Sequence, residues 1–230
     1  MERLLLMFSS ILQLLFNAVD IIIVGRFTGS TALAAVGATT ALINMMINLF
    51  IGVSIGTNVL AARYFAAKMP KELKGTVHTS VTFAIISGVF MGIMGVILAR
   101  FALQVMDTPD DVINQSVLYM RIYFCGMPFF MTYNFCAAVL RAIGDTKRPL
   151  IFLLISGAIN AILNYILVRF FAMGVAGVAI ATVVSQLISC VLVVSCLVRA
   201  EGAYKLDFKC LGIEWKYLKD VFKVGVPAGL

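Results

Sequence analysis

The sequence predicts an all-α protein whose helices cross a membrane several times. Hydrophobic residues make up 62% of its 230 residues and charged residues only 13%, whereas ordinary soluble domains carry about 25% charged residues. The apolar residues form blocks long enough to span a bilayer, and the charged residues collect in the short connectors between those blocks. These observations together indicate a polytopic helical bundle.

Six apolar segments are predicted to span the membrane. Each can cross a hydrocarbon core of ~30 Å at about 1.5 Å per residue. The first is expected to be a retained helix, because it is itself of spanning length and further spans follow it. The segments are residues 4–24, 31–62, 77–99, 115–140, 149–169 and 175–198.

The basic residues predict the orientation of these spans. With the N-terminus placed inside, most of the 18 Lys and Arg residues fall in the inner connectors. This bias predicts that both ends of the chain are cytoplasmic and that the protein lies in the cell membrane, of the bacterial inner-membrane type. The net charge of +7 therefore does not indicate nucleic-acid binding, for which the chain also lacks a motif. The basic residues left outside are Arg26, Arg100, Arg121 and Arg169.

The character of the chain changes after residue 198. Residues 199–222 mix basic and apolar groups and predict an amphipathic segment that lies on the inner membrane surface. Residues 223–230 begin another apolar run, which is expected to be the start of a seventh helix. Residues 1–198 are therefore expected to form one six-helix unit, and the chain to be half of a larger protein.

Asp20 is the carboxylate that lies well inside an apolar segment. An ionised carboxylate in hydrocarbon costs at least ~2.5 to 3.5 kcal/mol on insertion scales. Asp20 must therefore face a polar cavity, hold a proton, bind a cation or find a partner. His78, the single histidine, lies near the start of the third segment and is expected to be solvated or to cap it, with a proton relay as the alternative.

Helix depth predicts partners for Asp20. Counted from the predicted helix ends, Asp20, Asn164, Thr182 and Tyr123 lie at ~18 to 24 Å above the inner face, within about one helical turn. Tyr119 lies about one turn nearer the outside. This common depth predicts a polar layer inside the bundle, with the two tyrosines as candidate cavity-lining residues.

Amides flank the carboxylate in this layer. Asn160 and Asn164 are four residues apart and share one helix face, and Asn17 precedes Asp20 by three residues. Amide oxygens can ligate Na⁺, and amide N–H groups can donate to a carboxylate. A desolvated carboxyl has a raised pKa and can exchange protons nearer the working pH. The alternative is that these amides only join helices by hydrogen bonds.

Five stretches, in this order and spacing, resemble the multidrug and toxic compound extrusion (MATE) family of secondary transporters. They are VDIIIVGR at 19–26, LRAIGDTK at 140–147, NAILN at 160–164, GVAGVAIAT at 174–182 and KVGVP at 223–227. The resemblance implies about twelve helices in two six-helix lobes, of which this chain is the N-terminal lobe followed by the start of the seventh helix. A C-terminal lobe of the same transporter is then the missing partner.

The resemblance also implies a function. It implies efflux of amphipathic, often cationic organic compounds by antiport against Na⁺ or H⁺, with no other cofactor and no enzymatic activity. The coupling residues, and the ligands if the ion is Na⁺, would be Asp20, Asn160, Asn164 and Thr182. Position 164 is Asn where some members have Asp, which bears on the ion. The family further implies an asparagine on the fourth helix.

Asn134 is the candidate for that position. In a straight helix it lies ~9 Å from the inner face and misses the polar layer, unless Gly126 and Pro128 bend the helix.

The efflux function implied by the resemblance also gives the expected partners, which are a small-molecule substrate and membrane lipid. Three alternatives remain: a lipid-linked or polysaccharide flippase of similar architecture, an intramembrane enzyme, and a fragment without transport activity of its own.

Overall fold

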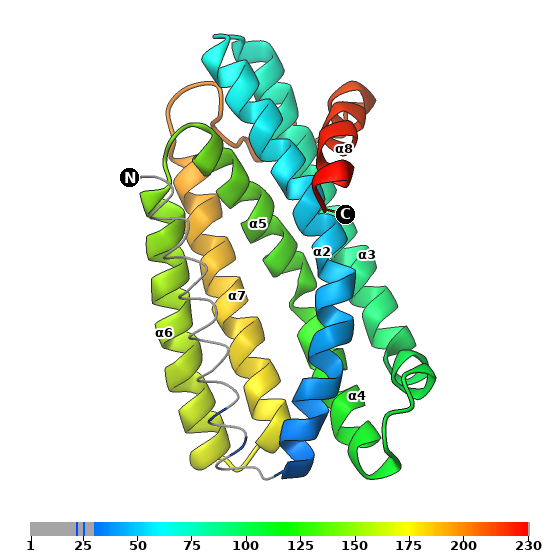
Figure 1. The fold of residues 1–230 in the computed structure, drawn as a ribbon. Helices are drawn as coiled ribbons and strands as arrows, with labels where there is room; N and C mark the ends of the chain where they lie inside the picture. Colours follow the sequence, from blue (N-terminus) through cyan, green and yellow to red (C-terminus); the bar gives the residue numbers. More distant parts are fainter. Residues whose placement is uncertain (1–21, 23–24, 26–29, 230) are drawn as a thin grey trace.

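A computed structural model describes Ile22, Gly25 and residues 30–229 of the chain (Figure 1). Apart from Ile22, the predicted first span therefore lies outside the described residues, and so do Asn17 and Asp20. The described part of the chain is helical and contains no strand. Its elements are α2 (Ser30–Ala66), α3 (Pro70–Val105), α4 (Asp110–Cys125), α5 (Met127–Ala142), α6 (Lys147–Arg169), α7 (Gly174–Val198), the 3₁₀ turn η1 (Phe208–Cys210) and α8 (Trp215–Gly229).

The long helices run side by side in one bundle with alternating directions (Figure 1). Residues 67–69, 143–146 and 199–214 connect helices at the upper end of Figure 1, and residues 106–109 and 170–173 connect them at the lower end. This alternation is the one that the sequence predicts. Which end faces the cytoplasm stays a prediction from the basic residues.

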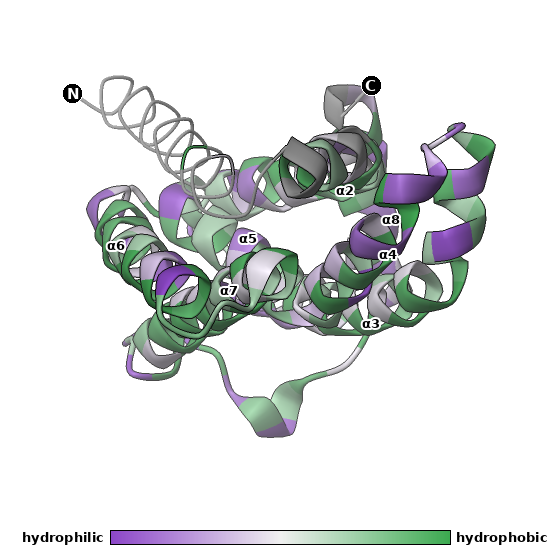
Figure 2. Cartoon of the chain, turned by 90° about the horizontal axis from the view of Figure 1, so that it is seen from below, coloured by the Kyte–Doolittle hydropathy of each residue, from purple (hydrophilic) through white to green (hydrophobic). Residues whose placement is uncertain are grey.

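Helices α2, α3, α6 and α7 are each long and apolar enough to cross a membrane. They match four predicted spans, and α3 is longer than predicted at both ends. Figure 2 shows mainly hydrophobic residues on the outward sides of these helices. On α3, for example, Phe90, Ile93, Ile97 and Phe101 form one exposed face. Such a face suits contact with lipid.

The segment 115–140, predicted as one continuous helix, is instead two helices. Together α4 and α5 pass the test for one span, but they are bent by 47° at the break. Pro128 has no N–H, so the carbonyl of Phe124 has no donor four residues later. Gly126 N donates instead to Tyr123 O at 2.9 Å, which tightens the last turn of α4. The bend at Gly126 and Pro128, which the sequence left open, is therefore present within the predicted span.

The break between α4 and α5 packs against a row of glycines in α3. A Cβ atom at Gly88 would lie 2.6 Å from Pro128 Cα, and one at Gly92 would lie 2.9 Å from Phe124 O. The ring of Phe124 fills the space where a Gly95 side chain would be. Only residues without side chains allow the backbones to approach this closely.

Helix α8 packs against α2 in the same manner (Figure 1). A side chain at Gly56 would collide with the carbonyl of Val221, and a Cβ at Gly225 would lie 2.7 Å from Val53 Cα. The helix is continuous from Trp215 to Gly229. It therefore covers both the end of the segment 199–222 and the expected start of the seventh helix.

The segment before α8 is tied to the first turns of α3. Asp207 N donates to His78 Nε2 at 3.1 Å, and Glu214 N donates to Thr79 Oγ1 at 3.2 Å. His78 Nδ1 lies 2.8 Å from Lys74 O. The two ring nitrogens thus face an amide N–H and a carbonyl, so the ring joins the segment before α8 to the first turns of α3. His78 is only 4% exposed, so the prediction of a solvated histidine was wrong.

Candidate functional site

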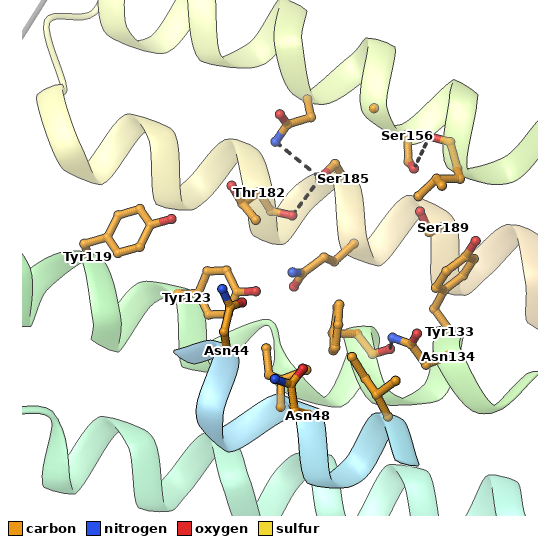
Figure 3. A pocket seen from close by; sticks show the side chains of 17 residues that line it. Asn44, Asn48, Tyr119, Tyr123, Tyr133, Asn134, Ser156, Thr182, Ser185 and Ser189 are labelled. Atoms are coloured by element: carbon orange, nitrogen blue, oxygen red, sulfur yellow. Dashed lines mark hydrogen bonds between the residues drawn. The ribbon is translucent and has the colours of Figure 1, made fainter. Parts of the chain in front are cut away.

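A cavity of about 330 Å³ lies inside the bundle, with walls from α2, α4, α5, α6 and α7. Figure 3 shows side chains from these helices directed into it. Its described lining is rich in amides and hydroxyls and contains no side chain that is charged at neutral pH. The polar lining residues are Asn44, Asn48, Tyr119, Tyr123, Tyr133, Asn134, Ser156, Asn160, Thr182, Ser185, Gln186 and Ser189.

Helical spacing explains how α6 and α7 present these groups. On α6, Ser156 and Asn160 are four residues apart and share one face. On α7, Thr182, Ser185 and Ser189 follow at intervals of three and four. Each helix thus turns a polar stripe to the cavity, while its remaining sides carry mainly apolar residues.

Five of the predicted site residues line this cavity together: Tyr119, Tyr123, Asn134, Asn160 and Thr182. Tyr119 and Tyr123 stack one turn apart on α4, with ring centroids 6.1 Å apart. Their roles in binding or coupling stay predictions, since the geometry reports only where the side chains lie. Asp20 and Asn17 are outside the described residues, so their relation to the cavity is not described.

Asn134 lines the cavity from the helix that follows the bend at Gly126. It lies on α5, beyond the break, whereas Tyr123 lies on α4 before it. The depth estimated for a straight helix had placed Asn134 outside the polar layer. Its Nδ2 donates to Phe130 O at 2.8 Å on its own helix, which fixes the orientation of the amide because a carbonyl only accepts.

A chain of hydrogen bonds joins α6 to α7 behind the cavity wall. Asn164 Nδ2 donates to Asn160 Oδ1 at 3.3 Å, and Asn160 Nδ2 donates to Ser185 Oγ at 3.5 Å. Ser185 Oγ donates in turn to the backbone carbonyl of Thr182 at 2.8 Å (Figure 3). The carbonyl of Thr182 can only accept, so Ser185 must donate to it and must accept from Asn160. The same constraint makes Asn160 accept from Asn164. Asn164 is itself fully buried and is linked to the cavity through Asn160.

Several hydroxyl groups of the wall donate their protons to backbone carbonyls. Thr182 Oγ1 donates to Val178 O at 3.0 Å, and Ser156 Oγ donates to Leu153 O at 3.1 Å. Tyr133 Oη donates across helices to Pro149 O at 3.1 Å. A hydroxyl has a single proton. These groups therefore offer only lone pairs to anything bound in the cavity.

Sequence and structure comparisons identify the family. The sequence model of the MatE family matches residues 6–166, well over half of the chain. The chain belongs to the MATE family. Its fold matches that of an outward-facing multidrug resistance MATE transporter with a TM-score of 0.90 at 24% identity, over 98% of this chain and 50% of that one.

Curated relatives of this MATE chain carry names of drug-resistance proteins. It is 32% identical to the probable multidrug resistance protein YoeA of Bacillus subtilis strain 168, over 98% of this chain and 50% of the relative. It is 23% identical to the multidrug export protein MepA of Staphylococcus saprophyticus, again over 98% of this chain and 50% of the relative. The chain thus spans about half the length of the curated relatives it matches.

Several lining residues of the MATE cavity were not predicted as site residues. Gln186 and Ser185 are the main ones, and both lie within four residues of Thr182 on α7. The i, i+4 rule applied to Thr182 would have found Gln186. Asn44 and Asn48 on α2 are further such residues, and both are exposed and line the cavity.

Proposed function

We propose that this chain is the N-terminal lobe of a multidrug efflux transporter that exports amphipathic, often cationic organic compounds. The observation that carries the proposal is the polar cavity, without charged side chains in its described lining, between helices whose outward sides are apolar. Such a cavity offers hydrogen bonds and tyrosine rings to an amphipathic ligand, whereas the surrounding lipid offers neither. The names of the half-matched relatives point in the same direction.

We further propose that Na⁺ or H⁺ drives the transport by antiport through Asp20. Asn160, Asn164 and Thr182 would be the other coupling residues. Their groups fit either ion: the hydroxyl oxygen of Thr182 retains lone pairs for a hard cation, and the asparagines supply amide oxygens and N–H groups. The ion would favour one access state, and the two lobes would rock about the central cavity.

The flippase alternative is less well supported by the cavity. A flippase for a lipid-linked or polysaccharide substrate would be expected to display more charge along its cavity. The described lining consists of neutral side chains, and the acceptors on it suit a cationic or N–H-bearing ligand.

The proposal is tested by transport into proteoliposomes that contain the two-lobe protein. The wild type is expected to move a cationic dye against its gradient when a Na⁺ or pH gradient is imposed. Asp20→Asn should still bind the dye and lose the driven accumulation, because the variant cannot titrate or neutralise a cation. Asp107→Asn, at an exposed carboxylate in the connector between α3 and α4, is the matched control and should behave like the wild type. Wild-type accumulation by Asp20→Asn would reject Asp20 as the coupling site.

A further inference from the structure

Two arginines lie on adjacent helices, near the end of the bundle at which residues 106–109 join α3 to α4. Arg100 is on α3, five residues before the helix ends at Val105, and Arg121 is on α4. Both side chains are exposed. Arg121 Nε donates across the two helices to Val96 O at 3.2 Å. This hydrogen bond fixes the Arg121 guanidinium against α3.

Helix geometry brings the two guanidinium groups together. In a regular α-helix, Val96 O is the carbonyl that accepts the backbone N–H of Arg100, so Arg121 Nε lies within one turn of Arg100. The Cα–Cβ bond leans toward the N-terminus of its own helix. Because α3 and α4 run in opposite directions (Figure 1), Arg100 leans back toward the level of Val96 and Arg121 leans outward toward it. The two side chains therefore converge.

No carboxylate of the described residues balances these two charges. The salt bridge found among those residues joins Arg148 to Asp145 instead. Two guanidinium groups on the same turn repel each other. Each presents N–H donors in a fork that matches the oxygens of a phosphate. An anion held between the two arginines would remove the repulsion and accept hydrogen bonds from both.

The surroundings of the pair favour a lipid as the source of that anion. The third predicted span ends at residue 99, so Arg100 lies at the expected boundary of the hydrocarbon. Arg121 is six residues inside the next predicted span, about 9 Å, a depth from which a long side chain can reach the boundary. Ile93 and Ile97 precede Arg100 by seven and three residues, share its side of α3, and are 56% and 65% exposed. An acyl chain below a phosphate at the arginines would cover this apolar face.

We propose that Arg100 and Arg121 together bind the phosphate of an anionic phospholipid of the phosphatidylglycerol type, whose chains lie along the exposed face of α3. A zwitterionic lipid has the same phosphate, but it brings its own cation close to the two arginines and binds less well. In the predicted orientation the lipid belongs to the outer leaflet. The proposed site is separate from the cavity, and it does not depend on the proposed export function.

The test compares dioleoyl phosphatidylglycerol with dioleoyl phosphatidylcholine. Their dissociation constants are measured by native mass spectrometry of the two-lobe protein in detergent, and the wild type should prefer phosphatidylglycerol. Arg100→Gln and Arg121→Gln should each weaken phosphatidylglycerol binding by about fivefold, because one basic residue contributes about that factor to binding of an anionic lipid. Binding of phosphatidylcholine should change much less.

Two control proteins and a soluble competitor make the test decisive. Arg169→Gln removes the same charge from an exposed position on α6 at the same end of the bundle and should bind phosphatidylglycerol like the wild type. The double variant Arg100→Lys and Arg121→Lys keeps both charges and should keep the preference. Glycerol 3-phosphate has the phosphate without chains and should not displace the lipid.

Three results would overturn the proposal. Equal affinity of the wild type for the two lipids would show that the arginines do not select an anionic headgroup. Equal weakening by Arg169→Gln would show that only the total charge matters. Displacement of the lipid by an equal concentration of glycerol 3-phosphate would assign the two arginines to a soluble phosphate compound instead.

Discussion

The two sides of the bundle join their helices by different means. The α6–α7 side uses amides and hydroxyls, linked from Asn164 to the Thr182 carbonyl. The α3 side uses glycines, which let the break between α4 and α5 touch the α3 backbone. Both are known ways to join helices in membranes. Because the glycine contacts leave no space for a side chain, we expect the cavity wall to tolerate added or lost atoms better than they do.

The largest loss of stability is expected from substitutions at the glycine contacts of α3. Gly88→Leu would force a side chain onto Pro128 Cα, only 2.6 Å from the new Cβ, and overpacking of this kind costs about 3 kcal/mol. We expect a large drop in the yield of monodisperse protein and in its melting temperature in detergent. Gly37→Leu is the matched control, because no atom of the described residues, apart from its own helix backbone, lies within 4 Å of its Cβ position. Equal stability of the two variants would contradict the close contact.

A smaller loss of stability is expected from a substitution where α8 packs against α2. Gly56→Ala adds one methyl group against the carbonyl of Val221, and we expect a loss of about 2 kcal/mol that separates the two helices. Trypsin should then cut α8 faster at Lys216 and Lys219. Gly212→Ala places its methyl group in open space in the preceding connector and should leave the cleavage rate unchanged. Unchanged cleavage in Gly56→Ala would show that α8 does not depend on this contact.

The hydrogen bonds between α3 and the segment before α8 are expected to contribute less to stability than the contact between α2 and α8. His78→Phe keeps a ring but removes the acceptor for Asp207 N, at a cost of about 1 kcal/mol. Hydrogen exchange should speed up at the Asp207 amide. Thr79→Val should do the same at the Glu214 amide, so each variant is the control for the other. If neither variant altered its own amide, the segment would be held by apolar packing alone.

The smallest effect on stability is expected in the cavity wall. Ser185→Ala removes one link between Asn160 and the Thr182 carbonyl, and the net loss should be below about 1 kcal/mol. Asn160 would lose its orientation, so ligand affinity should change more than the melting temperature does. A melting-temperature drop as large as that of Gly88→Leu would remove the contrast between the two sides.

The sequence predicted the features that depend on length and hydropathy. The limits of α6 and α7 agree with the predicted spans to within two residues, because apolar blocks end abruptly at charged or glycine-rich connectors. The constant rise of a helix also predicted one depth for Tyr123, Asn164 and Thr182. Tyr123 and Thr182 line one cavity, whereas Asn164 is only linked to it through Asn160.

What the sequence did not predict depends on contacts between distant parts of the chain. The bend at Gly126 lies inside an apolar run, where hydropathy does not change. His78 is buried by a segment 129 residues later in the chain, which no local pattern reveals. Gln186 is different, because it lies four residues after Thr182 on α7 and this spacing alone indicates a shared helix face.

The attachment of α8 has a mechanical consequence. Helix α7 precedes α8 in the chain, but the glycine contact at Gly56, the Tyr217 ring over Gly75 and the Glu214 amide on Thr79 all join α8 and its first residues to α2 and α3. A load applied along α8 would therefore pass into the α2–α3 hairpin and largely bypass α7. We therefore expect the hairpin, rather than the hydrogen-bonded α6–α7 wall, to move with α8.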